Sequence, residues 1–310
     1  MKLFFLTFIV FISVNASAQF SGEITYEYEI IPLKEGVNID SLYNNLTGSS
    51  SVYVITDSYY KSTYYKNGTM TYSYTYHDET KRMYDEQAKQ DYITYRDSRD
   101  SNLGGNQFEI FKDSTINILG YEAVLLKTNY NGKATKSYYS TTQKVNYETF
   151  KGHEVANWYN RLKALDGGIL LKSITHYEQH TEILTAVNVT ERQVSREEFN
   201  LPNGKDVVAS FSALDDRVEL DPPSRDQIRC YQQLVRKAIS TIEKNIPVTI
   251  YLQFILSEEG KISNLGVVER DKYGLYLTAI DILKNCGLSF IPGKINGKPV
   301  ASETYFPVEF

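Results

Sequence analysis

The sequence predicts an α+β protein with two domains: a large curved antiparallel sheet, then a small domain ordered helix, strand, strand, helix, strand. Three observations predict this fold. Residues 20–205 alternate short strand patterns with turn signals and contain 21 of the 26 tyrosines. Residues 224–310 carry two helical apolar periods, one before and one after a hairpin pattern. The chain of 310 residues is long enough for both domains to bury a core.

The first 18 residues have the layout of a secretory signal peptide. Lys2 precedes an apolar run from Leu3 to Val14, and Ala16-Ser17-Ala18 follows. This run of 12 residues is shorter than the ~20 residues that a membrane-spanning helix needs. We therefore expect cleavage after residue 18, which leaves a periplasmic chain that starts at Gln19, has no transmembrane span and can associate with the outer membrane.

Residues 19–205 are predicted to form the large sheet, and its clearest hairpin surrounds Asn67-Gly68. Pairing outward from this turn predicts three opposed pairs: Tyr65 with Met70, Thr63 with Tyr72, and Tyr59 with Tyr76. One face then shows six side chains: Tyr59, Tyr65, Met70, Tyr72, Tyr74 and Tyr76. Two interpretations stay open, because these rings can pack as core beneath a helix or form a hydrophobic groove for an apolar ligand.

Further strands and two helices complete this domain. A second Asn-Gly turn at Asn131-Gly132 joins residues 123–130 to residues 133–140. Strand patterns also cover residues 22–31, 51–56, 90–96, 169–177 and 182–194. Helical patterns cover residues 38–46 and 147–165, and Gly167-Gly168 ends the second of them. We expect this longer helix to fill the concave side of the sheet.

Residues 206–223 are predicted to be an extended linker without a core, because they are rich in turn formers such as Asp221-Pro222-Pro223. The small domain, residues 224–310, then shows helical patterns over 226–245 and 273–286. Between them, residues 248–257 and 262–269 form a hairpin pattern. The closing segment has the turn residues Pro292, Gly293, Asn296, Gly297 and Pro299, followed by a strand over residues 301–310.

Four motifs of the small domain are distinctive: Glu259-Gly260-Lys261-Ile262, Phe290-Ile291-Pro292-Gly293, Asn296-Gly297-Lys298-Pro299-Val300 and Tyr305-Phe306-Pro307-Val308-Glu309-Phe310. With these motifs the domain resembles the C-terminal domain of the TonB energy-transducer family, although Phe290 stands where that family usually has Trp. In that family the last strand accepts a short peptide of an outer-membrane receptor. The resemblance therefore implies protein binding by strand addition at Ala301, Glu303, Thr304, Tyr305 and Phe306.

The large sheet carries three shorter motifs: Gly22-Glu23-Ile24-Thr25-Tyr26, Ile118-Leu119-Gly120-Tyr121-Glu122-Ala123 and Gly167-Gly168-Ile169-Leu170-Leu171-Lys172. With them the domain resembles the LolA-type lipoprotein-carrier fold and the GLPGLI-type exported proteins of Bacteroidetes. This resemblance implies a half-barrel that holds a helix on its concave side. It also implies that a lipid or lipoprotein is an alternative partner, bound in the concave groove.

Composition and motifs exclude several function classes. The formal net charge is −5 and no basic stripe is present, so a nucleic-acid partner is not expected. The chain has no Gly-rich phosphate loop, G-x-S-x-G, C-x-x-C or H-E-x-x-H motif, so we predict no catalytic residue and no cofactor. His176 and His180 would stand about 13 Å apart on one strand and meet only across a turn, so no metal site is predicted.

The only two cysteines, Cys230 and Cys286, both lie in the small domain. Export would place them in an oxidising compartment, where a disulfide can form, whereas the core position of Cys286 favours a buried thiol. The sequence leaves both states open.

The sequence as a whole predicts an exported, non-enzymatic envelope protein whose small domain binds an envelope or outer-membrane protein, with a link to outer-membrane transport. Binding of a hydrophobic ligand by the large sheet is an alternative. Energy transduction is another, and it requires an uncleaved leader that anchors the chain.

Overall fold

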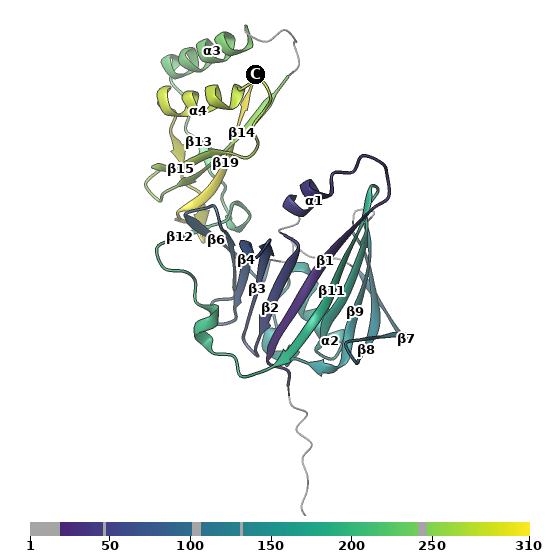
Figure 1. Cartoon of the computed structure of the whole chain (residues 1–310). Coiled ribbons are helices and arrows are strands. Elements are labelled where there is room, and N and C mark those ends of the chain that lie inside the picture. The colour runs from purple at the N-terminus through teal and green to yellow at the C-terminus, as the bar shows by residue number, and fades with distance from the viewer. Residues whose placement is uncertain (1–18, 46–47, 101–106, 131–132, 241–246) are drawn as a thin grey trace, which may run out of the picture.

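The structure is a computed structural model that describes residues 19–45, 48–100, 107–130, 133–240 and 247–310. The predicted signal peptide and the predicted turn at Asn131-Gly132 lie outside these residues. One sheet of 15 strands runs through both predicted domains, in the order β15-β14-β19-β12-β6-β5-β4-β3-β2-β1-β11-β10-β9-β8-β7. Figure 1 shows its larger part curving around α2, while the part that contains β14, β15 and β19 carries α3 and α4.

Eleven strands form the curved part, and each pairs antiparallel with its neighbours in this part. They are β1 (Gly22–Pro32), β2 (Ser50–Ile55), β3 (Tyr59–Lys66), β4 (Thr69–His77), β5 (Arg82–Gln87), β6 (Tyr92–Asp97), β7 (Phe108–Ile118), β8 (Tyr121–Tyr130), β9 (Lys133–Lys144), β10 (Gly168–His176) and β11 (His180–Glu191). The short helix α1 (Ile39–Asn45) connects β1 to β2. The curved antiparallel sheet predicted from the hairpin signals is therefore present.

The single helix predicted over residues 147–165 is wrong, because three short pieces replace it: η2 (Tyr147–Phe150), η3 (Val155–Asn157) and α2 (Trp158–Ala164). Ala156 and Asn157 have φ angles of 53° and 55°, and this left-handed backbone cannot continue a right-handed helix. The predicted stop holds, since the Gly167 N–H donates to the Leu162 carbonyl at 2.7 Å. These pieces cover the concave side, where Phe150 and Leu162 pack with buried residues of β1, β2, β3 and β4.

The predicted register of the Asn67-Gly68 hairpin holds only next to the turn. Tyr65 pairs with Met70, but Tyr64 pairs with Tyr72, so Thr71 is an extra residue of β4 and forms a bulge. The predicted pairs of Thr63 with Tyr72 and of Tyr59 with Tyr76 are therefore wrong. A shift of one residue exchanges the faces of β3, so Tyr60 and Tyr64 lie on the concave side instead of Tyr59.

The small domain has the predicted order of elements: α3 (Arg225–Ile239), β14 (Thr249–Leu256), β15 (Ile262–Val267), α4 (Leu275–Asn285) and β19 (Ser302–Glu309). Its core lies between the sheet and α4, where Phe254, Ile282, Phe290 and Val308 are buried. A disulfide joins Cys230 of α3 to Cys286 at the end of α4. Of the two states that the sequence left open, the structure has the disulfide.

The predicted linker is not a free connector. Its first residues form β12 (Asp206–Ala209), which pairs in parallel with β6 and, through Ala209 and Ser302, with β19. Val208 and Ala209 are buried at this junction. Further along, β13 (Glu219–Leu220) pairs with β16 (Phe290–Ile291). The prediction failed because backbone pairing with distant strands leaves no local signal. β12 makes the sheet mixed and connects its two parts (Figure 1).

The remaining short elements are η4 (Arg196–Phe199), η5 (Phe211–Ala213), β17 (Lys294–Ile295) and β18 (Lys298–Pro299). β17 and β18 pair around Asn296-Gly297, whose φ angles of 52° and 73° are those of the predicted two-residue turn. Among the residues described, no helix is long and apolar enough to cross a membrane.

Candidate functional site

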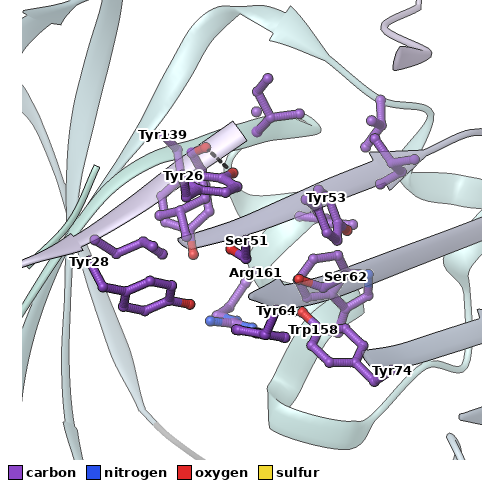
Figure 2. Close-up of a pocket in the computed structure, with 17 residues that line it drawn as sticks. Tyr26, Tyr28, Ser51, Tyr53, Ser62, Tyr64, Tyr74, Tyr139, Trp158 and Arg161 are labelled. Carbon is purple, nitrogen blue, oxygen red and sulfur yellow. Dashed lines mark hydrogen bonds between the residues drawn. The ribbon is translucent and has the colours of Figure 1, made fainter. Parts of the chain in front are cut away.

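A cavity of about 250 Å³ lies between the concave face of the sheet and α2, and we call it the tyrosine pocket (Figure 2). Six tyrosines from five strands line it: Tyr26, Tyr28, Tyr53, Tyr64, Tyr74 and Tyr139. They share one side because side chains on a strand alternate between its two faces. Trp158, Arg161 and Leu162 of α2 line the opposite side. The pocket is therefore formed by aromatic rings from the sheet and one face of a short helix.

Three hydrogen-bond donors of the pocket are buried without a partner: the Tyr53 hydroxyl, Trp158 Nε1 and Arg161 Nε. The Tyr26 hydroxyl differs, because it donates to the Leu170 carbonyl at 2.7 Å. A buried donor without an acceptor costs about 1–3 kcal/mol. Three such donors around one cavity mark a place where an acceptor group of another molecule would fit.

Four of the pocket tyrosines stay neutral at physiological pH. Burial raises the pKa of Tyr26, Tyr28, Tyr53 and Tyr74 well above that of an exposed phenol, because an ionised phenol would lose its hydration. None of the described residues that line the pocket is Asp or Glu. The walls thus combine apolar ring faces with neutral hydroxyl groups and one cation, Arg161.

A second cavity of about 420 Å³ adjoins the first, and both are lined by Tyr64, Tyr74, Trp158 and Arg161. We call it the side cavity, and its other lining residues include Tyr60, Tyr72, Arg96 and His153. Arg96 forms an ion pair with Asp85 at 2.9 Å. Burial lowers the pKa of His153 to about 3, so its imidazole is neutral. Its Nε2 shares a hydrogen bond of 2.5 Å with the Tyr60 hydroxyl.

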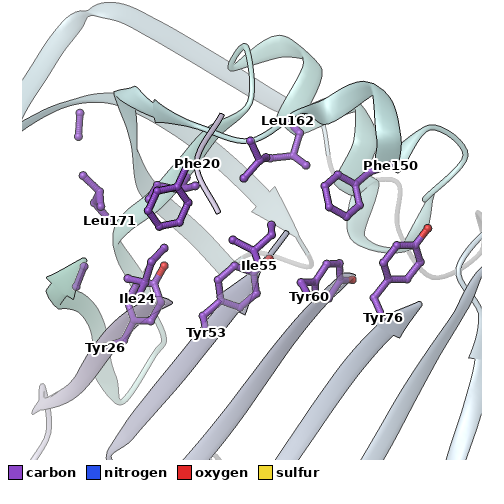
Figure 3. Packing of buried hydrophobic residues seen from close by; sticks show 14 of the residues in the cluster. Phe20, Ile24, Tyr26, Tyr53, Ile55, Tyr60, Tyr76, Phe150, Leu162 and Leu171 are labelled. Atoms are coloured by element: carbon purple, nitrogen blue, oxygen red, sulfur yellow. The ribbon is translucent and has the colours of Figure 1, made fainter. Parts of the chain in front are cut away.

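The six side chains of the predicted groove do not lie together in the structure. Tyr74 lines both cavities and Tyr72 the side cavity. Tyr76 is buried beside Phe150, with ring centres 5.9 Å apart (Figure 3). Tyr59 lies on the opposite face of the sheet and stacks on Phe199. Tyr65 and Met70, next to the hairpin turn, line neither cavity.

Sequence reasoning missed most of the pocket, including Tyr26, Tyr53, Tyr139, Trp158 and Arg161. One signal was available. Arg161 follows Trp158 by three residues and precedes Leu162, which places a cation on the apolar face of the predicted helix. A charged residue in that position indicates either a buried ion pair or a ligand.

The predicted protein-binding strand, β19, is paired with β14 from Ser302 to Glu309. Val248 and Phe310 exchange both backbone hydrogen bonds, at 3.2 and 2.9 Å. Because bonded and non-bonded pairs alternate in an antiparallel ladder, the backbone groups of Thr304 and Phe306 point to β14, whereas those of Tyr305 point away from it.

The edge of β19 that faces away from β14 is its outer edge. Most of the backbone groups on this edge already form hydrogen bonds or lack an N–H donor. The Ala301 carbonyl accepts a hydrogen bond of 2.9 Å from Ala209 of β12. Pro307 has no N–H, and the Glu309 N–H donates to the Tyr231 hydroxyl at 3.3 Å. An added strand would therefore pair mainly around Tyr305. The Glu303 side chain is buried, and it accepts hydrogen bonds from Tyr92 and Gln253.

The predicted loop motif packs against the former linker. A side chain at Gly293 would place its Cβ 2.6 Å from Leu214, and the Asn296 N–H donates to the Asp215 carboxylate at 2.6 Å. Pro292, Gly297 and Pro299 belong to the same loop.

The histidine pair of the sequence lies on the hairpin of β10 and β11. His176 Nδ1 and Thr181 Oγ1 are 3.1 Å apart, whereas His180 stacks on Tyr177. Within the described part of the chain, no three His, Cys, Asp or Glu residues gather closely enough to hold a metal ion.

No protein-family model matches this chain, and no curated protein matches it. The solved structures that are similar over part of it include the following three. PNGF-II has 12% identity and a TM-score of 0.39 over 77% of this chain, which spans 44% of the length of PNGF-II. A LolA superfamily protein from Nitrosomonas europaea has 6% identity and a TM-score of 0.28, over 59% of this chain and 91% of that one. MucB in complex with MucA(peri) has 10% identity and a TM-score of 0.25, over 67% and 61%. At these TM-scores the similarity carries no argument about function.

Proposed function

We propose that this protein is an exported, non-enzymatic binding protein that holds a molecule with a long apolar part in the tyrosine pocket. One observation carries the proposal: a cavity between the sheet and α2 is walled by aromatic rings, while three buried donors around it lack acceptors. Removal of apolar ligand surface from water stabilises a complex by about 25 cal/mol per Å². The unpartnered donors would orient the polar part of the same ligand.

Two features support a periplasmic location. Association with the outer membrane is a further part of the proposal. The leader pattern of residues 1–18 predicts export. The disulfide between Cys230 and Cys286 is of a kind that persists in oxidising compartments and is rare in the cytosol. Sequencing of the mature N-terminus tests this part. Gln19 as the first residue would support export with cleavage and would exclude an anchored energy transducer.

The binding proposal has a built-in probe, because Trp158 is the only tryptophan of the chain and lines the pocket. Titration of delipidated protein with 1-dodecanol is expected to change the tryptophan emission with saturation at one equivalent. Mass spectrometry of an organic extract of the freshly purified protein should identify a bound amphiphile.

A matched pair of variants tests the place of binding. Ser62 is buried and lines the pocket, so Ser62→Leu should fill the cavity and abolish the dodecanol response. Thr63, the next residue of β3, points to the other face, so Thr63→Leu should bind as the wild type does. Circular dichroism checks that both variants fold. A folded Ser62→Leu protein that binds dodecanol with unchanged affinity would disprove the proposed place of binding.

A second proposal, strand addition at β19, is favoured by the backbone of Tyr305, which points away from β14. An envelope protein, such as an outer-membrane receptor involved in transport, would supply the added strand. Tyr305→Pro should weaken binding of a receptor peptide without unfolding the domain, because it removes an N–H on the open side. Thr304→Pro is unsuitable for this test, since its N–H belongs to the ladder with β14. Unchanged peptide affinity of Tyr305→Pro in a titration would remove this edge from consideration.

A further inference from the structure

We propose that the molecule held in the tyrosine pocket carries an anionic head, a carboxylate or a phosphate, and that Arg161 binds this head. The inference rests on the proposed function, because it names the chemical class of the ligand of the same pocket. The cavity volume and the aromatic walls indicate only that the ligand has an apolar part. The environment of Arg161 indicates the charge of its polar part.

Arg161 lies at the border of the tyrosine pocket and the side cavity. Figure 2 shows its guanidinium group reaching between Tyr28, Tyr64 and Trp158. Within the part of the chain that the structure describes, it forms no ion pair, and its Nε is buried without an acceptor. Its guanidinium carbon lies 5.6 Å from the centre of the Trp158 ring.

Of the three other half-buried arginines in the described part of the chain, two are neutralised by carboxylates, and the third, Arg82, lies with its guanidinium carbon 3.9 Å from the centre of the Tyr95 ring. Arg96 pairs with Asp85 at 2.9 Å. Arg192 pairs with Glu198 at 2.7 Å and with Glu23 at 3.1 Å. Among the described residues, Arg161 has no equivalent partner, although tyrosine rings and leucine side chains line its pocket.

Among the residues that the structure describes, no Asp or Glu lines either cavity to balance this charge. Burial keeps the phenols of Tyr26, Tyr53 and Tyr74 protonated and neutral, because it raises their pKa well above that of an exposed phenol. His153 is neutral, and the charge of Arg96 is already matched by Asp85. The cavities therefore carry one uncompensated positive charge next to apolar walls. In such low-dielectric surroundings an anion is strongly preferred over a neutral group, and a cation is excluded.

The geometry of the donors also suits an oxyanion. A guanidinium group presents parallel N–H groups that match the two oxygens of a carboxylate or a phosphate. Trp158 Nε1 lies on the same helix face and is a further donor without a partner. An apolar tail attached to this head would extend between Tyr53, Leu162 and Ile169.

The test uses delipidated full-length protein and four probes with the same tail, each below its micellar concentration: dodecanoate, dodecyl phosphate, 1-dodecanol and dodecyltrimethylammonium. Trp158 emission reports binding, and calorimetry confirms the affinities. We expect at least one of the two anions to bind about tenfold or more tightly than dodecanol, and the cation to bind more weakly than dodecanol. The stronger of the two anions identifies the head group as a carboxylate or a phosphate.

Arg161→Met, which keeps an unbranched apolar side chain, should lower the affinity for the preferred anion by about tenfold or more. It should lower the affinity for dodecanol by less than it lowers the affinity for the anion, because a hydroxyl group carries no charge that pairs with the guanidinium group. Lys163→Met is the matched control, because Lys163 is an exposed cation of the same helix and lines neither cavity. This control variant should bind all four probes as the wild type does.

The outcomes separate the two proposals. If none of the four probes binds, the proposed function fails together with this inference. If dodecanol binds as tightly as both anions, or if Arg161→Met keeps its full affinity for the anion, the proposed function survives and the anionic head is overturned.

Discussion

Removal of the disulfide between Cys230 and Cys286 is expected to destabilise the small domain by about 4 kcal/mol. The two cysteines are 56 residues apart in sequence, so the bond closes a loop of that length in the unfolded chain. In the chain-entropy description, a loop of this size lowers the unfolded-state entropy by about 14 cal/mol/K, which corresponds to about 4 kcal/mol at 25 °C.

The consequence should be largest at α3. None of its side chains is fully buried, and it packs on the core through half-buried residues such as Tyr231, Leu234 and Val235. The disulfide of Cys230 cross-links it to the end of α4, whose residues Ala279 and Ile282 are fully buried. Without the disulfide, α3 should therefore lose protection before β14 and β19 do.

The assay is urea unfolding of the double variant Cys230→Ala, Cys286→Ala, followed by far-ultraviolet circular dichroism and by hydrogen exchange of α3. Both cysteines of the chain are then absent, so dithiothreitol should change the wild type towards the variant and leave the variant unchanged. A loss of less than about 1 kcal/mol, with α3 as protected as in the wild type, would refute the reasoning that the bond holds this helix.

Two further predictions concern the pH dependence and the junction of the sheet. Burial lowers the pKa of His153 from 6.5 to about 3, so the unfolded chain binds this proton more readily than the folded protein does. Stability from this residue is present above pH 6.5 and is lost as the pH falls toward 3. Between pH 7.5 and pH 5 the loss should be about 2 kcal/mol, and urea titrations of His153→Gln should lack it. At the junction, Val208→Asp should cost more than about 3 kcal/mol because it buries a charge between β6 and β19. Val207→Asp, at a site that is 43% exposed, should change the stability by less than about 0.5 kcal/mol, and equal effects of the two variants would argue against the junction.

Local sequence signals predicted the elements of this protein more accurately than their arrangement. The Asn67-Gly68 and Asn296-Gly297 turns adopt left-handed angles as predicted, because these residues accept positive φ regardless of the rest of the chain. The alternating and helical apolar periods likewise predicted the curved sheet and the order of elements in the small domain. These features depend on neighbouring residues only.

The candidate site was less accessible from the sequence. Because of the bulge at Thr71, Tyr60 and Tyr64 lie on the concave face and Tyr59 on the opposite face, which is the reverse of the prediction. No residue near Thr71 indicates a bulge in the sequence. The predicted groove therefore shares only part of its residues with the tyrosine pocket. Tyr26, Tyr53 and Tyr139 meet there because β1, β2 and β9 curve around α2.

The sequence by itself determined many of the strands, the Asn67-Gly68 and Asn296-Gly297 turns, the leader pattern and the presence of two cysteines and one tryptophan. Only the tertiary structure decided that β12 connects the two parts of the sheet and that the cysteines lie close enough to bond. It also decided that, among the described residues, no carboxylate lines the two cavities that contain Arg161. The physical reason is the range of the interactions. Backbone angles and apolar periods are set within a few residues, whereas register, cavities and charge balance depend on which distant segments meet.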